Sequence, residues 1–224
     1  SKESIFTGLN NPKVRSVSDV EFDEFFGFTD SEVQELFAYY GLEKHLETVK
    51  TWYDGYRFGN VDVYCPWDVL NYCDVLRKDP QAQPQNYWMN TSGNDAVRFF
   101  VEKAKNQTTK REIERLIAGE EITKEIRQEL TYKEMYQNIE NVWSVLFTTG
   151  YLTQRGRAEG NRLRLVIPNL EIRNIFTEQI MEYFKAQVKE DGYALNQFCD
   201  ALEKGDAQKV EKYFEEYLRK TVSI

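Results

Sequence analysis

The spacing of hydrophobic residues predicts helices on both sides of a short hairpin in the first 80 residues. Apolar side chains over 33–40 follow helical spacing behind Thr29-Asp30-Ser31-Glu32, a capping-box sequence, and Gly41 is a typical helix end. A second helix is predicted over 42–53. Residues 56–58 and 61–64 flank Gly59-Asn60, a two-residue turn that favours a β-hairpin, and Pro66 suits the first position of the next helix.

The pattern after residue 80 predicts further helices and a second hairpin. Helices are expected over about 94–105, from a second capping-box sequence at 109–112, and from about 139 to Gly150, whereas the polar stretch 120–135 is expected to be a connection. Strand-like segments at 151–155 and 162–167 surround a turn, and Asn169 is expected to cap a long helix. A helical pair with its turn at Gly205-Asp206 comes last.

This order predicts a mainly α protein with small β-hairpins. We divide it into a helical region with a small hairpin over 1–132, a winged-helix-like region over 133–190, and a helical connector over 191–224. The winged-helix interpretation rests on the succession of a helix, a hairpin with a basic tip, and another helix.

Composition narrows the class of protein. Hydrophobic residues make up 41% of the chain and charged residues 29%, which is typical of a soluble globular protein. The formal net charge of −8 argues against a general nucleic-acid coat but leaves room for a local basic patch. The three cysteines form no C-x-x-C pair, and His45 is the only histidine. Because neither a membrane-spanning run nor a signal peptide is visible, we expect a cytoplasmic protein.

Two catalytic motifs are missing from the sequence. A P-loop needs a glycine followed directly by lysine, and none of the 12 glycines here has that neighbour. A PD-(D/E)XK nuclease needs lysine two residues after a glutamate, and no glutamate in the chain has one. We therefore predict no catalytic residue and no metal ligand within these 224 residues.

The densest group of aromatic residues lies at 52–67, around the first hairpin. One interpretation is a packing cluster in which Asp54-Gly55 is a plain turn, and such clusters are mostly of this kind. The other is a phosphate-binding loop made of Asp54, Gly55, Tyr56 and Arg57, because the planar guanidinium of arginine binds phosphate through two parallel hydrogen bonds.

The second hairpin carries a local excess of positive charge. Arg155, Arg157, Arg162 and Arg164 face only one acidic residue, Glu159, within 154–164. This pattern fits the solvated face of an exposed hairpin, because arginine alternates with leucine over 162–165. It also fits a wing that contacts DNA phosphates or the minor groove, with weak and steeply salt-dependent binding.

Seven landmarks in fixed order make the chain similar to a bacterial family usually called AAA-ATPase-like, whose members often carry a C-terminal PD-(D/E)XK nuclease-like domain. The landmarks are SKESIFTGLNN at 1–11, FGFT at 26–29, WYDGYRFG at 52–59, PW at 66–67, YWMNTSGN at 87–94, FTTGYLT at 147–153 and IPN at 167–169. The chain resembles the helical lid and winged-helix middle portion of that family.

The resemblance implies a function within a larger protein. It implies an N-terminal P-loop domain that binds ATP and magnesium, and a C-terminal nuclease-like domain, as partners of this chain. The chain would then be a non-catalytic lid and connector that transmits the nucleotide state to a domain acting on nucleic acid, with Asp54, Gly55, Tyr56 and Arg57 near the nucleotide. The alternative is a nucleic-acid or protein binding module that uses the basic hairpin 154–164, without enzymatic activity.

Overall fold

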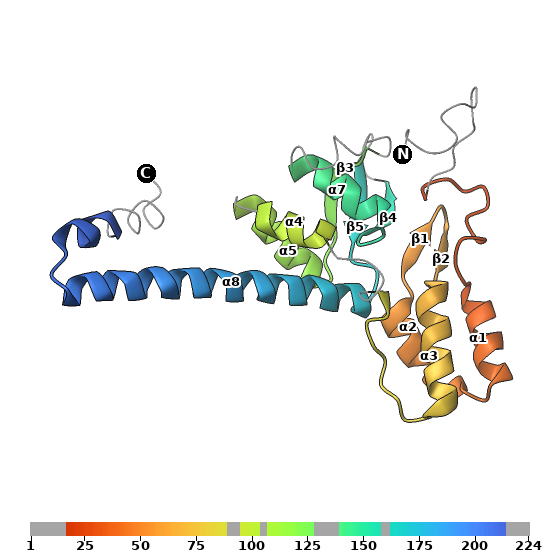
Figure 1. Ribbon diagram of the computed structural model, residues 1–224. Coiled ribbons are helices and arrows are strands. Elements are labelled where there is room, and N and C mark those ends of the chain that lie inside the picture. Colours follow the sequence, from red (N-terminus) through yellow and green to blue (C-terminus); the bar gives the residue numbers. More distant parts are fainter. Residues whose placement is uncertain (1–16, 89–94, 104–106, 128–138, 158–161, 214–224) are drawn as a thin grey trace, which may run out of the picture. The chain divides into compact units, whose positions relative to one another are not determined.

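The computed structural model describes residues 17–88, 95–103, 107–127, 139–157 and 162–213 (Figure 1). The chain forms two compact units, Ser1–Gln179 and Ile180–Ile224. It is mainly helical with two small antiparallel sheets, as the sequence predicted. Among the described helices, none combines the length and the apolar character needed to cross a membrane. The expected boundary at 132/133, the wing tip at 158–161 and the end of the connector after 213 lie outside the described residues.

The first elements match the predicted order. They are α1 (Asp30–Tyr39), a 3₁₀ turn η1 (Glu43–His45), α2 (Leu46–Tyr53), β1 (Tyr56–Phe58), β2 (Val61–Val63) and α3 (Pro66–Lys78). Thr29 and Glu32 form the predicted capping box, and Pro66 is in the first turn of α3. Gly59 has a φ of +49° and allows the tight turn between β1 and β2.

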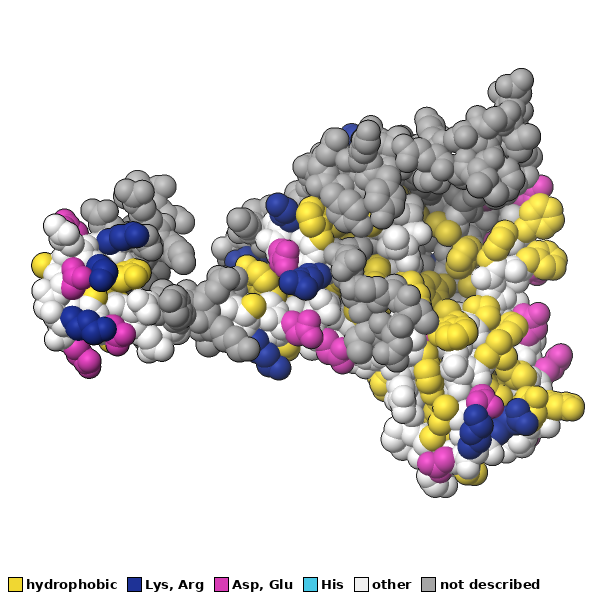
Figure 2. Space-filling view, in the orientation of Figure 1, with side chains coloured by type: hydrophobic (Ala, Val, Ile, Leu, Met, Phe, Trp, Pro, Cys, Tyr) yellow, Lys and Arg dark blue, Asp and Glu magenta, His cyan; other side chains and the backbone are white. Residues whose placement is uncertain are grey.

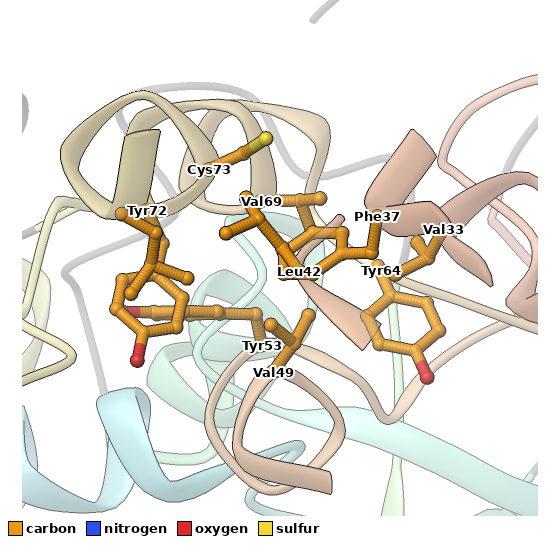
Figure 3. Packing of buried hydrophobic residues seen from close by; sticks show 10 residues of the cluster. Val33, Phe37, Leu42, Val49, Tyr53, Tyr64, Val69, Tyr72 and Cys73 are labelled. Carbon is orange, nitrogen blue, oxygen red and sulfur yellow. The ribbon is translucent and has the colours of Figure 1, made fainter. Parts of the chain in front are cut away.

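Helices α1, α2 and α3 enclose the first hydrophobic core (Figure 3). Tyr53 is completely buried, and its hydroxyl donates to the Gln85 carbonyl at 3.0 Å. The Tyr64 hydroxyl donates to Asp30 Oδ1 at 2.7 Å. Aromatic residues of the group at 52–67 are therefore part of this core, and the hydroxyl groups of Tyr53 and Tyr64 are hydrogen-bonded. The buried members of this core are Val33, Phe37, Leu42, Val49, Tyr53, Tyr64, Val69, Tyr72, Cys73 and Leu76.

The second half of the first unit contains the larger sheet. Its elements are α4 (Asp95–Lys103), α5 (Gln107–Ile117), β3 (Ile122–Glu125), α7 (Ile139–Thr148), β4 (Thr153–Arg157), β5 (Arg162–Val166) and the beginning of α8 (Leu170–Glu203). The strand order is β3-β5-β4, with both pairs antiparallel. Trp143 is completely buried and meets Phe100 edge-to-face at 4.5 Å between ring centroids, so α4 and α7 share a core.

Two predictions about this half were wrong. Residues 122–125 form a strand rather than a connection, because Ile122–Glu125 pairs with β5. The predicted capping box at 109–112 does not begin a helix, since α5 already starts at Gln107 and Thr109 is a buried residue inside it. Helix α8, with 34 residues, continues without interruption past residue 190, where the connector was expected to begin.

The second unit contains the rest of α8 and a helical segment over 207–213. Gly205 has a φ of +66°, and Asp206 Oδ1 accepts from the backbone N–H of Lys209 at 3.2 Å, so the turn predicted at Gly205-Asp206 is confirmed.

In the first unit, large hydrophobic side chains are exposed on and beside the α1–α3 region (Figure 2). They include Phe22, Phe25, Phe26, Tyr39, Trp67 and Leu70.

Candidate functional site

The two hairpins lie side by side and enclose a hollow that contains arginines from both. The backbone N–H of Arg57 on β1 donates to Thr153 Oγ1 on β4 at 2.8 Å, and Gln154 Nε2 donates to the Gly59 carbonyl at 3.4 Å. The hollow has a volume of about 490 Å³. It is lined by Ser18, Val20, Arg57, Gly59, Asn60, Gln154, Arg155, Gly156 and Arg157. We call it the arginine hollow.

An acidic side chain on β2 pairs with two of these arginines. Asp62 Oδ2 lies 3.1 Å from Arg57 Nη1, and Asp62 Oδ1 lies 3.6 Å from Arg155 Nη1. All three side chains are between 32% and 45% exposed, so water screens both ion pairs and each contributes little to stability. Asp62 thus lies between the two guanidinium groups and keeps them close together. Separating either guanidinium from Asp62 would cost little energy.

The other two candidate arginines of the hairpin are not among the residues that line the hollow. Arg164 Nη2 donates to the Arg155 carbonyl at 2.7 Å, and Arg164 Nη1 lies 3.7 Å from Glu121 Oε1. Arg162 is exposed at the start of β5. The structure therefore joins Arg57 to Arg155 and Arg157 and leaves Arg162 and Arg164 outside that group.

The remaining residues of the predicted phosphate loop hold the two halves of the first unit together. Gly55 has a φ of +101°, and a Cβ at this position would collide with the carbonyl oxygen of Pro168. A side-chain hydrogen bond links Tyr56 to Asn169, and burial raises the Tyr56 pKa. Asp54 is half-buried, and burial likewise raises the pKa of its carboxyl. Two landmarks more than 100 residues apart, at 52–59 and 167–169, are thus in direct contact.

A pair of buried carboxyl groups lies at the same junction. Asp68 in the first turn of α3 and Glu171 in the first turn of α8 are both completely buried, and their side chains interact directly with each other. The backbone N–H of Trp88 donates to Glu171 Oε1 at 2.8 Å, whereas Glu171 Oε2 and both oxygens of Asp68 have no hydrogen-bond partner among the described residues. We call Asp68 and Glu171 the carboxyl pair.

Burial and mutual repulsion change the acidity of the carboxyl pair. Desolvation and the neighbouring Asp68 charge raise the pKa of Glu171 to about 8, from an ordinary value of 4.5. Desolvation also raises the pKa of Asp68. Two carboxyl groups can form a hydrogen bond only when one of them holds a proton. The interaction with Asp68 favours the protonated form of Glu171.

Sequence reasoning did not find the carboxyl pair. An acidic residue in the first turn of a helix is common, because it interacts favourably with the helix dipole, and so neither residue stands out. Each follows a proline within three residues, at Pro66 and Pro168, but this resemblance between two distant segments does not predict that they meet. Within the described ranges, no group of His, Cys, Asp and Glu side chains has an arrangement that could hold a metal ion.

Comparison with curated proteins finds similarity to "Uncharacterized protein in vnfD 5'region" of Azotobacter chroococcum mcd 1. The two sequences are 28% identical over 191 residues, which cover 81% of this chain and 32% of that protein. The chain therefore corresponds to about a third of the length of this relative. No protein-family profile and no solved structure matches the chain.

Proposed function

We propose that the chain is a non-catalytic lid and connector within a larger AAA-ATPase-like protein, and that the arginine hollow contacts the phosphates of a nucleotide. One observation carries the proposal: Arg57 and the hairpin residues Arg155 and Arg157, which are about 100 positions apart in sequence, line the same hollow. Guanidinium groups bind phosphate oxygens through paired, charge-assisted hydrogen bonds, and they keep their charge at every physiological pH.

Two further observations support this proposal. The Azotobacter relative extends far beyond the matched segment, which agrees with a module that works beside other domains. The order α5, β3, α7, β4 and β5, with β5 between the other two strands, agrees with a winged-helix-like unit behind the lid. The residues that line the hollow fit phosphate, whereas a magnesium ion would be held by another domain and by the phosphates themselves.

Asp62 has a defined part in this function. It occupies Arg57 and Arg155 with a carboxylate, so a phosphate group would have to replace it. The replacement exchanges one exposed anion for a more highly charged one, and both arginines keep a partner throughout. Asp62 should therefore reduce the affinity of the hollow for phosphate and improve its selectivity for multiply charged anions.

The proposal is tested by titrating the 224-residue chain with inorganic tripolyphosphate and with Mg-ATP by calorimetry. Arg57→Ala should weaken binding roughly tenfold, because a hydrogen bond to a charged group is worth about 1.5–3 kcal/mol. Asp62→Asn should tighten binding several-fold, because the competing carboxylate is removed. Arg115→Ala is the matched control, since Arg115 pairs with Glu120 on the surface and does not line the hollow.

Opposite effects of Arg57→Ala and Asp62→Asn would support the phosphate site, and equal affinities of all four proteins would refute it. In the longer protein, Arg57→Ala should also lower ATP turnover while the fold is retained. Unchanged ATP turnover in that variant of the longer protein would refute the proposed lid function.

A second candidate function is nucleic-acid binding by the hairpin. The observation that favours it is the exposure of Arg155, Arg157 and Arg162 on one hairpin, next to helix α7. These side chains would contact backbone phosphates and so position the protein without reading the base sequence.

A further inference from the structure

The two hairpins around the arginine hollow lead into their next helices in the same way. Strand β2 ends at Val63, and Asp68 follows five positions later in the first turn of α3. Strand β5 ends at Val166, and Glu171 follows five positions later in the first turn of α8. Each of the two hairpins beside the hollow is therefore joined by a short segment to one member of the carboxyl pair.

The contacts between these two segments are direct and tight. Gly55, two positions before Arg57, lies against the Pro168 carbonyl so closely that a methyl group would not fit. Tyr56 is hydrogen-bonded to Asn169, and Asn169 Oδ1 also accepts the backbone N–H of Ile172 at 3.1 Å, which caps α8. A displacement of α8 relative to α3 would therefore be transmitted to Arg57 and to β4.

The hydrogen-bond inventory of the carboxyl pair requires one proton. Glu171 Oε1 accepts the Trp88 N–H, whereas Glu171 Oε2 and both oxygens of Asp68 are buried without a hydrogen-bond partner among the described residues. If both carboxyls were ionised, two negative charges would lie in contact inside the protein, which is strongly unfavourable.

Among the described residues, the titratable groups that interact with the carboxyl pair are acids and not bases. They are Tyr53 from α2, Tyr56 from β1, Cys65 before α3 and Tyr87 from the segment before α4. Burial raises the pKa of the Cys65 thiol to about 12, and it also raises the pKa values of the three tyrosine hydroxyls. All four are neutral at pH 7–9, so the state of the pair depends on its own proton.

We propose that Asp68 and Glu171 form a one-proton clasp that positions the two hairpins around the arginine hollow, so that loss of the proton loosens the hollow and weakens phosphate binding. Both residues act as positioning residues, because neither lines the hollow. The inference rests on the proposed function and adds its regulation by pH. The clasp is closed while Glu171 holds the proton and opens as the pH rises toward 8 and above.

The test is the pH profile of tripolyphosphate binding by the 224-residue chain between pH 6.5 and 9. The wild-type affinity should fall roughly tenfold relative to Glu171→Gln across this range, since one unit of pKa corresponds to a tenfold change in an equilibrium constant. Glutamine keeps an N–H donor for Asp68 and an oxygen for Trp88, but it has no proton to lose. Both proteins bind the same ligand, so the ratio of their affinities does not depend on the titration of tripolyphosphate itself.

Glu178→Gln is the matched control, because Glu178 is exposed on the same helix. It should follow the wild-type profile. Parallel profiles for wild type and Glu171→Gln would overturn the clasp, even if both proteins bind phosphate well.

A second measurement separates failure of the clasp from failure of the proposed function. The Glu171 pKa is higher in the folded than in the unfolded chain, so its stabilisation is complete below about pH 4.5 and is lost as the pH rises toward 8. Urea unfolding should show an unfolding constant that rises up to about tenfold per pH unit across this window in wild type, and a smaller rise in Glu171→Gln. If no tripolyphosphate binds at any pH, the proposed function and the coupling to it both fail, while this unfolding series still decides whether the pair shares a proton.

Discussion

At the scale of single residues, Gly55 is the position where the fold tolerates least change. Its φ of +101° is unfavourable for any residue with a Cβ, and that atom would also collide with the Pro168 carbonyl. Gly55→Ala should therefore cost more than about 2 kcal/mol, measured by urea unfolding, because backbone strain of about 1–3 kcal/mol adds to the displacement of α8.

Gly41→Ala is the control for this prediction. Gly41 has a φ of +67° but no atom within 4 Å of the missing Cβ, so its replacement carries only the conformational cost of a left-handed residue, about 1–2 kcal/mol. Equal losses for the two variants would mean that the contact between Gly55 and Pro168 contributes nothing.

The sequence provided individual candidate residues but not their grouping. Arg57, Arg155 and Arg157 were candidates because their type and local charge excess fit phosphate, and that reasoning needs no three-dimensional information. Their common hollow depends on β1 lying beside β4, which no local pattern specifies. Asp68 and Glu171 were missed for the same reason, since a shared proton exists only after two helices 100 positions apart come together.

At the scale of secondary-structure elements, the two capping-box sequences show what local pattern can decide. Thr29 and Glu32 cap α1 through hydrogen bonds between each side chain and the other residue's backbone N–H. The helix does not extend further back, because Thr29 has an extended backbone and Phe28 pairs with Tyr64 in a β-bridge. The sequence at 109–112 also begins with Thr and ends with Glu, yet Glu112 Oε2 pairs with Lys124 Nζ on β3 at 2.9 Å. Tertiary contacts there override the local signal.

Strand β3 was missed because its signal is not local. Only Ile122 is buried in the sequence Ile-Thr-Lys-Glu, so neither alternation nor hydrophobicity is strong. Its strand conformation comes from pairing with β5, where Ile122 lies opposite Leu165. A contact with α7 also holds the strand, because the Lys124 ammonium lies 4.8 Å from the Trp143 ring centre.

The capping box gives a prediction for α1. Thr29→Ala should lower the free energy of unfolding by about 1 kcal/mol, since one backbone donor in the first turn loses its partner. Thr177→Ala on α8 is the control: its exposed hydroxyl only donates to the Arg173 carbonyl within the helix, and its loss should cost little. Urea denaturation of the two variants in parallel provides the comparison, and equal midpoints would show that the cap does not stabilise the unit.

At the scale of the whole molecule, net charge separates the two candidate functions. A chain of formal net charge −8 is repelled by a polyanion at long range, whereas a small phosphate that enters the arginine hollow meets mainly the local charge of Arg57, Arg155 and Arg157. We therefore expect a 20-base-pair duplex to bind weakly, with no saturation below about 100 µM at roughly 150 mM salt, which is the weak end of non-specific affinities.

Fluorescence polarisation with a labelled duplex checks this expectation, and comparison with a triple arginine variant makes it decisive. In a protein with Arg155, Arg157 and Arg162 all changed to alanine, the duplex titration should be unchanged within error, because binding is already negligible, while tripolyphosphate binding is lost. The opposite result would be micromolar duplex binding by wild type that falls steeply with salt and disappears in the triple variant. That outcome would assign the hairpin to nucleic acid, and the arginine hollow would then be one end of a longer phosphate-binding surface.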